Sequence, residues 1–132
     1  MARIDHVGIA VGSIEEAARV YAEGLGLPCT RVETVEAQGV KVGFIPIGES
    51  EIELLEPLGA ESPVGRFLER RGEGIHHICI AVDDIGAAME QLKAQGMRLL
   101  SEAPQTGAGG ALVAFVHPAS ANGVLLEITQ KP

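Results

Sequence analysis

Hydrophobic residues alternate with small or polar ones in two similar stretches that lie far apart along the chain. IDHVGIAVGSIEEAA starts at residue 4 and IHHICIAVDDIGAAM starts at residue 75, a constant offset of 71 residues. The identical pairs are Ile4/Ile75, His6/His77, Ile9/Ile80, Ala10/Ala81, Val11/Val82, Ile14/Ile85 and Ala17/Ala88. The same offset carries Phe44 onto Phe115. Because a period of two residues is typical of a strand, we predict strands over 4–11 and 75–82.

A helix is predicted after each of these strands, where the hydrophobic period changes to that of a helix. Ser13 and Glu16 form a capping box, and Asp84 occupies the equivalent N-cap position. The apolar positions of each helix share one face: Ile14, Ala17, Ala18 and Tyr21 in the first, and Ile85, Ala88, Met89 and Leu92 in the second. Gly24 and Gly96 are expected to end the two helices.

Three further strands are expected in each half of the chain, which gives the order β-α-β-β-β twice. Their predicted ranges are 29–35, 40–47 and 51–56, and then 98–102, 111–117 and 123–129. A short helix within 63–72 joins the halves. We therefore predict an α+β fold, in which two tandem βαβββ modules, about 1–70 and 71–132, form a curved mixed sheet within a single domain, 1–132. The helices cover the convex side, and the concave side is an open cleft.

Composition narrows the range of functions. The chain has 132 residues, and its formal charge of −8 argues against nucleic acid or an anionic membrane as a partner. No apolar run approaches the roughly 20 residues of a membrane span, and the first residues lack the pattern of a signal peptide. Cys29 and Cys79 are expected to be reduced thiols. These features predict a cytoplasmic location.

The two histidines of GIHHICIAV point to opposite faces of the predicted strand, because side chains alternate along a strand. His77 shares its face with small residues and repeats His6, so both histidines are expected to face the cleft. His76 repeats Asp5 on the other face. We expect His76 to serve structure or to orient its neighbour.

Glutamates near the end of each half can complete a metal site with the two histidines. Glu127 lies in an otherwise apolar strand, where a lone buried carboxylate is costly without a metal or another partner. The gapless repeat pairs it with Glu56, whereas a loop three residues longer in the second half pairs it with Glu53. Glu51 is expected to be a solvated edge charge. The resulting ligand set has two imidazoles and two carboxylates, which suits Zn, Co, Ni, Mn or Fe.

The whole chain resembles the vicinal oxygen chelate superfamily, which includes glyoxalases, bleomycin resistance proteins and dioxygenases. Within it, the chain is similar to the epimerases that act on methylmalonyl-coenzyme A. The resemblance is carried by IDHVGIAV, ELLEPLGAESPVGRFL, GEGIHHICIAVDDI, LLSEAPQTGAGG, FVHP and GVLLEITQ. It implies a glyoxalase-like fold and a metal site made by His6, Glu53, His77 and Glu127, so the family favours Glu53 over Glu56.

The implied reaction interconverts the (2R) and (2S) forms of methylmalonyl-CoA by proton transfer at C2 through a metal-stabilised enolate. Glu127 and Glu53 would be the catalytic residues, with one divalent ion (Co, Ni, Zn, Mn or Mg) as cofactor. The partner would be an acyl-CoA substrate, and the protein would form a homodimer. The alternatives are a glyoxalase I-type lactoylglutathione lyase and a non-catalytic small-molecule binding protein of the same fold.

The sequence departs from the family at two positions. Some of these epimerases carry a second catalytic glutamate where this chain has Val42, and Ala119 replaces a lysine that often follows HP. Three other features are expected to lie outside the catalytic machinery. The cluster Arg66, Arg70 and Arg71 is expected to be a solvated helix face, TGAGGA (106–111) a flexible loop at the rim of the cleft, and His117 a structural or surface residue.

Overall fold

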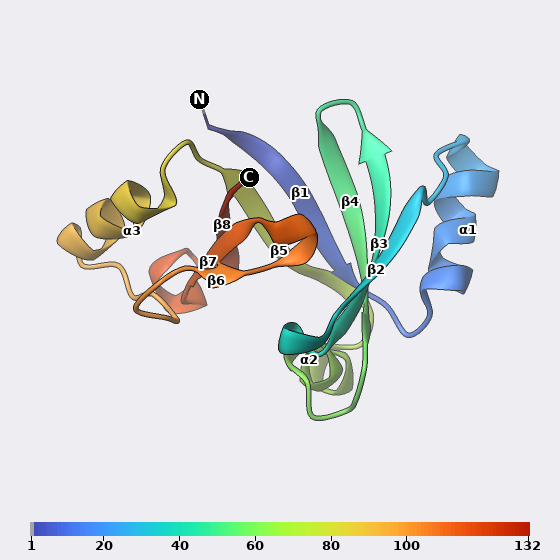
Figure 1. Cartoon of the computed structure of the whole chain (residues 1–132). Coiled ribbons are helices and arrows are strands. Elements are labelled where there is room, and N and C mark those ends of the chain that lie inside the picture. Colours follow the sequence, from blue (N-terminus) through green and yellow to red (C-terminus); the bar gives the residue numbers. More distant parts are fainter. Residues whose placement is uncertain (1) are drawn as a thin grey trace. The chain divides into compact units, whose positions relative to one another are not determined.

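A computed structural model describes residues 2–132 of the protein (Figure 1). Its strands are β1 (Arg3–Ala10), β2 (Arg31–Val35), β3 (Val40–Ile47), β4 (Ser50–Pro57), β5 (Gly74–Ala81), β6 (Gln105–Thr106), β7 (Leu112–Val116) and β8 (Leu126–Gln130). Its α-helices are α1 (Ile14–Leu25), α2 (Pro63–Arg71) and α3 (Ile85–Ala94). These elements form two compact units. The first unit comprises residues 6–76, and the second comprises residues 77–132 with the described residues before His6.

The two units have the same internal topology. In the first, the strand order is β2-β3-β4-β1, with β1 parallel to β4 and the other pairs antiparallel. In the second, the order is β5-β8-β7-β6, with β5 parallel to β8 and the other pairs antiparallel. Each unit therefore has the predicted order β-α-β-β-β.

Helix α1 covers one face of the first sheet. Ser13 begins the helix by accepting a hydrogen bond from the Glu16 backbone N–H at 3.2 Å. The core under the helix contains Val11, Ile14, Ile45 and Leu54, with Ile9, Ala17, Tyr21 and Ile52 packed against them. Because side chains alternate, His6 and Glu53 lie on the opposite face, away from α1.

Helix α3 covers the second sheet in the same way. Asp84 accepts a hydrogen bond from the Ala87 backbone N–H at 3.0 Å, which confirms the predicted N-cap. The core of this unit contains Ile85, Met89, Ala114 and Ile128, with Val82, Ala88, Leu92 and Leu99 packed against them. His77 and Glu127 therefore lie on the face opposite α3, as His6 and Glu53 do with respect to α1.

Three expectations about the limits of elements differ from the structure. Helix α1 continues through Gly24 and ends at Gly26, which adopts the left-handed conformation (φ 70°) and donates its N–H to the carbonyl groups of the last turn. The strand expected over 98–102 is reduced to a single bridge between Leu99 and Val116, and the edge strand is instead β6. The predicted strand over 29–35 is shortened to β2.

We expect Gly65→Ala to lower the free energy of unfolding by about 1–3 kcal/mol, because a Cβ at this position would overlap the Gly59 carbonyl oxygen and approach that of Ala60 at 2.9 Å. Gly24→Ala is the matched control. Its Cβ meets no atom within 4 Å, and alanine in a helix interior is expected to add about 0.5–1 kcal/mol. Urea unfolding measures both variants. Equal stability of Gly65→Ala and wild type would contradict the close approach.

Candidate metal and acid–base site

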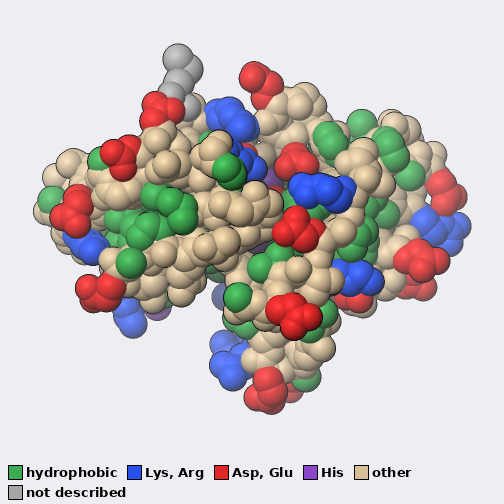
Figure 2. Space-filling model, in the orientation of Figure 1, with side chains coloured by type: hydrophobic (Ala, Val, Ile, Leu, Met, Phe, Trp, Pro, Cys, Tyr) green, Lys and Arg blue, Asp and Glu red, His purple; other side chains and the backbone are tan. Residues whose placement is uncertain are grey.

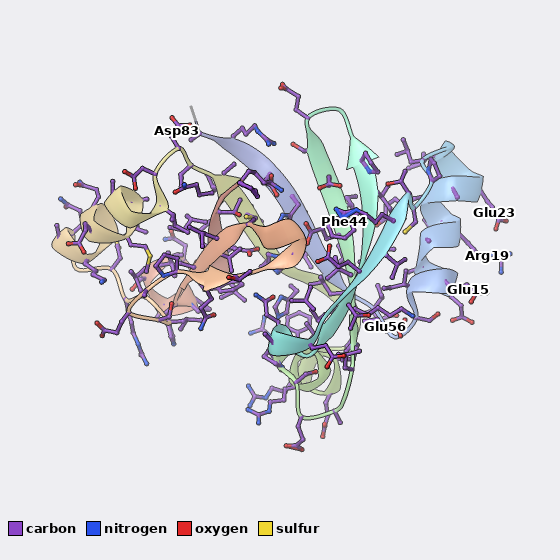
Figure 3. All side chains as sticks on the ribbon, viewed as in Figure 1. Glu15, Arg19, Glu23, Phe44, Glu56 and Asp83 are labelled. Atoms are coloured by element: carbon purple, nitrogen blue, oxygen red, sulfur yellow. The ribbon has the colours of Figure 1, made fainter. Side chains whose placement is uncertain are left out.

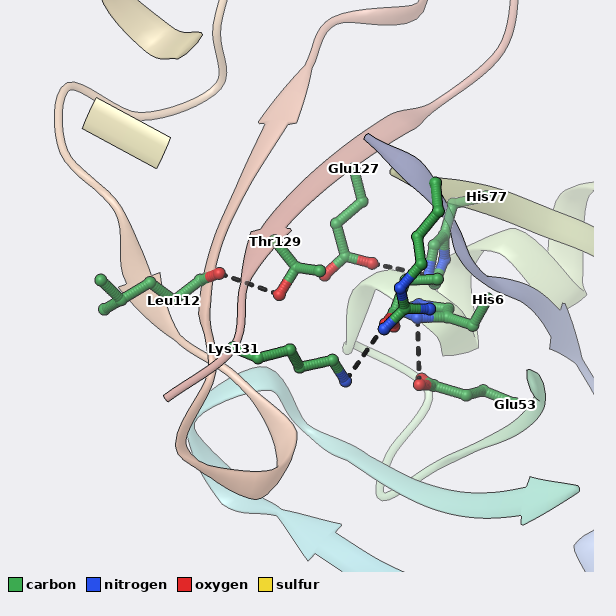
Figure 4. A network of polar contacts seen from close by, with 9 residues as sticks. His6, Glu53, His77, Leu112, Glu127, Thr129 and Lys131 are labelled. Atoms are coloured by element: carbon green, nitrogen blue, oxygen red, sulfur yellow. Dashed lines mark hydrogen bonds and ion pairs between the residues drawn. The ribbon is translucent and has the colours of Figure 1, made fainter. Parts of the chain in front are cut away.

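A buried histidine and a buried glutamate meet on the face of the first unit that lies opposite α1. His6 comes from β1 and Glu53 from β4, and these strands pair in parallel with Gly8 opposite Glu53. The His6 Nδ1 and Glu53 Oε2 atoms are 3.1 Å apart (Figure 4), and the two side chains are only 7% and 9% exposed. A carboxylate this far from water needs such a partner, because burying it alone is costly.

The second unit contains the repeat-related pair. His77 comes from β5 and Glu127 from β8, with Cys79 opposite Glu127 in the parallel register. The His77 Nε2 and Glu127 Oε1 atoms are 2.9 Å apart (Figure 4), and these side chains are 7% and 8% exposed. The His77 ring also makes an edge contact with Phe115 at a centroid distance of 5.9 Å.

The strand register identifies which glutamate of the first unit corresponds to Glu127. Glu53 lies between Gly8 and Phe44, and Glu127 lies between Cys79 and Phe115. These flanking residues are related by the 71-residue offset, so Glu53 is the structural counterpart of Glu127 although the two are 74 residues apart.

Glu56 has a different role, at the start of helix α1. Its Oε1 accepts a hydrogen bond from the Ile14 backbone N–H at 2.9 Å, and Gln130 accepts one from Ile85 at 2.9 Å in the second unit. Figure 3 shows Glu56 near the first turn of α1. Both side chains bind N–H groups that helices leave without an intrahelical partner.

We expect Glu56→Ala to destabilise the protein by about 1 kcal/mol, because the first turn of α1 loses its hydrogen-bond acceptor. Glu56 belongs to neither buried pair, so we expect any activity per folded molecule to change by less than about twofold. A twofold change in rate corresponds to less than about 1 kcal/mol in the activation free energy. Urea unfolding and an initial-rate assay measure the two effects. Loss of catalysis in a folded Glu56→Ala variant would contradict the assignment of Glu53, rather than Glu56, to the site.

The remaining residues singled out in the sequence lie outside these two pairs. His76 packs edge-on against Phe67 of α2, with a centroid distance of 5.0 Å. His117 Nδ1 accepts a hydrogen bond from the Ala119 backbone N–H at 3.0 Å. Glu51 is half-buried. The structure gives His76 and His117 packing and capping roles.

The arginine cluster, the TGAGGA segment and Val42 lie on different elements. Arg66 lies 3.9 Å from Glu61, and the Arg71 guanidinium lies 5.8 Å from the centre of the Phe67 ring. TGAGGA contains the end of β6 and a short 3₁₀ helix, Ala108–Gly110. Val42 is buried in β3, where its register neighbours are Glu33 and Leu55.

Sequence reasoning missed two features near the candidate residues. Phe44 and Phe115 lie opposite the two glutamates in register, and their identity at the 71-residue offset was a signal for this. Asp5 is buried and forms ion pairs with Arg3 at 3.5 Å and Lys131 at 3.3 Å. The sequence carried no corresponding signal, because Lys131 lies at the other end of the chain.

The donor atoms of both pairs are suited to a divalent metal. Each pair offers one imidazole nitrogen and one carboxylate oxygen, and neither includes a thiolate. This combination fits Zn and other first-row divalent ions. All four side chains are more than nine-tenths buried, which limits competition from water for a bound ion. The residues therefore fit a metal site.

Comparison with known proteins establishes the class. Residues 5–115 match the family model described as the glyoxalase/bleomycin resistance protein/dioxygenase superfamily. Because this match spans most of the chain, the protein belongs to that superfamily.

The similar proteins define a narrower group within this class. The chain is 45% identical to the ethylmalonyl-CoA/methylmalonyl-CoA epimerase of Cereibacter sphaeroides, covering 97% of each chain. It is 43% identical to the human mitochondrial methylmalonyl-CoA epimerase, covering 98% of this chain and 74% of the human one. The expected relationship to the methylmalonyl-CoA epimerases is therefore confirmed.

A solved structure supports the same grouping. A variant of the Streptomyces coelicolor methylmalonyl-CoA epimerase, in complex with 2-nitronate-propionyl-CoA, is 34% identical and has a TM-score of 0.94. The match covers 98% of this chain and 96% of that one. The predicted glyoxalase-like fold is confirmed. None of the helices in residues 2–132 meets the length and hydrophobicity of a membrane span.

Proposed function

We propose that this protein interconverts (2R)- and (2S)-methylmalonyl-CoA, using His6, Glu53, His77 and Glu127 as the ligands of one divalent metal. Relatives that are 43–45% identical over nearly the whole of this chain are epimerases of this substrate, which supports the reaction. The observation that carries the residue assignment is the repeat-related pairing of a buried glutamate with a buried histidine in each unit.

Epimerisation requires a proton to leave C2 on one face of the substrate and a proton to return on the other. Glu127 is assigned as a ligand and as one of the two acid–base groups. Glu53 is a ligand, the other acid–base group, or both. When bound, the metal supplies a Lewis acid that stabilises negative charge developing on the thioester oxygen. Two carboxylates, one from each unit, suit a reaction that needs one acid–base group for each face of the substrate.

The histidines hold these carboxylates in place. Each imidazole lies within hydrogen-bond distance of its glutamate, so each carboxylate has a fixed direction before substrate arrives. The buried surroundings exclude water, which strengthens electrostatic interactions with the reacting group.

The remaining parts of the proposal are a homodimer in the cytoplasm and a single domain formed by the two units. Neither Cys29 nor Cys79 forms a disulfide, which suits a reducing compartment. Symmetric dimers are the commonest assemblies of soluble proteins.

The proposed function is tested by incubating the metal-loaded protein with a single epimer of methylmalonyl-CoA and following loss of optical purity. We expect complete epimerisation. A parallel assay with the hemithioacetal of methylglyoxal and glutathione addresses the lyase alternative, which the relatives do not favour. Turnover of the hemithioacetal without epimerisation would contradict the proposal, and activity on neither substrate would favour a binding protein.

A further inference from the structure

One cation occupies the same face of the first sheet as Glu53. The strands of this sheet contain three Lys or Arg residues in the described part of the chain: Arg3, Lys41 and Arg31. The register places Arg31 opposite Phe44, and Phe44 opposite Glu53. Residues in register point to the same side of a sheet, so Arg31 shares the face of Glu53, whereas Arg3 and Lys41 have the opposite parity.

The Arg31 guanidinium is held close to the middle of this face. Its central carbon lies 3.8 Å from the centre of the Phe44 ring, a cation–π contact that directs the side chain across β3 towards β4. Phe44 is buried and lies on the side of the sheet away from α1 (Figure 3). Because Phe44 lies in register between Arg31 and Glu53, a guanidinium over its ring is displaced from β2 in the direction of Glu53.

Glu33, two residues along β2, forms an ion pair with the guanidinium. The Arg31 Nη1 and Glu33 Oε1 atoms are 3.3 Å apart, and the side chains are 51% and 34% exposed. Arg31 therefore keeps donors accessible to solvent, because a guanidinium has five N–H groups and this ion pair uses only some of them.

A local positive charge such as that of Arg31 would help this acidic protein to bind an anionic ligand. The chain has a net charge of −8, and Figure 2 shows Lys and Arg side chains in small, separate groups on the visible face. An acyl-CoA with a free carboxylate is a polyanion, so it needs local positive charge to approach an acidic protein. A planar guanidinium suits carboxylate and phosphate oxygens, which it can bind with two parallel hydrogen bonds.

We propose that Arg31 binds an anionic group of the acyl-CoA substrate and thereby sets its affinity. This inference rests on the proposed function. The closeness of the guanidinium to Glu53 favours the carboxylate beside the reacting carbon, and the phosphates of the coenzyme offer the same chemistry.

The test compares Arg31→Gln with wild type in steady-state kinetics on methylmalonyl-CoA and in calorimetric binding of the same compound. We expect KM and Kd to rise about tenfold, with kcat within a factor of about three, because a hydrogen bond to a charged group is lost. Arg31→Lys should recover only part of the affinity, since an ammonium group lacks the planar fork.

Arg19→Gln is the matched control. It removes the same charge from the exposed side of α1, where Arg19 pairs with Glu23 at 2.8 Å and this hydrogen bond raises the pKa of the guanidinium (Figure 3). We expect wild-type KM. Glu33→Gln should lower KM two- to threefold by releasing Arg31, an outcome that a damaged fold cannot produce.

Two shortened ligands identify the anionic group. If Arg31 binds the carboxylate, Arg31→Gln lowers the affinity for methylmalonyl-pantetheine as much as it lowers the affinity for methylmalonyl-CoA. The affinity for propionyl-CoA, which lacks this carboxylate, stays unchanged. The opposite pattern identifies the phosphates. Unchanged KM and Kd for methylmalonyl-CoA in Arg31→Gln would overturn the inference.

If the wild type binds this compound without epimerising it, the proposed function fails, and the comparison of Kd values still decides the role of Arg31.

Discussion

Replacing Glu127 by glutamine is expected to abolish deuterium incorporation at C2 of methylmalonyl-CoA in heavy water. The glutamine keeps the shape of the side chain but removes the negative charge and the ability to accept the C2 proton. General acid–base groups typically contribute a hundred- to ten-thousandfold in rate, so we expect a loss of at least that order. Nuclear magnetic resonance of the C2 position measures the exchange.

Glu15→Gln provides the control for this loss. Glu15 lies in the first turn of α1 and is exposed (Figure 3), so the same chemical change there removes a charge without touching either buried pair. We expect wild-type exchange in this variant. Undiminished exchange in Glu127→Gln would remove Glu127 from the acid–base machinery.

Replacing His77 by alanine is expected to weaken binding of Co²⁺ at least a hundredfold. Changes to the partners of metal ligands already cost ten- to a hundredfold in affinity, and His77→Ala removes a donor atom itself. The variant also leaves Glu127 without its partner at 2.9 Å. Equilibrium dialysis measures the affinity, and the visible absorption of bound Co²⁺ reports the coordination.

His117→Ala is the control for His77→Ala. Its Nδ1 accepts a backbone hydrogen bond at the loop after β7, so its loss should affect that loop and leave metal affinity unchanged. Equal Co²⁺ affinity in His77→Ala and wild type would contradict the role of His77 as a ligand.

Strand alternation predicted the faces of β1 and β5, because their two faces meet different surroundings. On β1, Ile9 packs under α1 while His6 faces the other side. Helix starts were equally predictable, since Ser13 and Asp84 cap their helices through local hydrogen bonds. The end of α1 could not be predicted from the sequence, because both Gly24 and Gly26 can end a helix. Only the observed backbone distinguishes them.

The choice between Glu53 and Glu56 illustrates a different limit. The repeat keeps its 71-residue offset through Phe44 and Phe115, but the glutamates are 74 residues apart. The three additional residues lie between β7 and β8, in the segment that contains the 3₁₀ helix Pro118–Ser120. A loop insertion leaves no trace in hydrophobic alternation, so the residues alone left Glu53 and Glu56 open. The family resemblance favoured Glu53, and the strand register shows that Glu53 is the counterpart of Glu127.

We propose that a divalent metal, with His6, Glu53, His77 and Glu127 as its ligands, supports proton transfer at C2. The most direct measurement is deuterium exchange at C2 of methylmalonyl-CoA by three preparations of the same protein: metal-loaded, chelator-treated, and reloaded after chelation. We predict rapid exchange in the first, loss in the second and recovery in the third. Exchange that persists at full rate after complete metal removal, or no exchange with any divalent ion, would contradict this role of the metal.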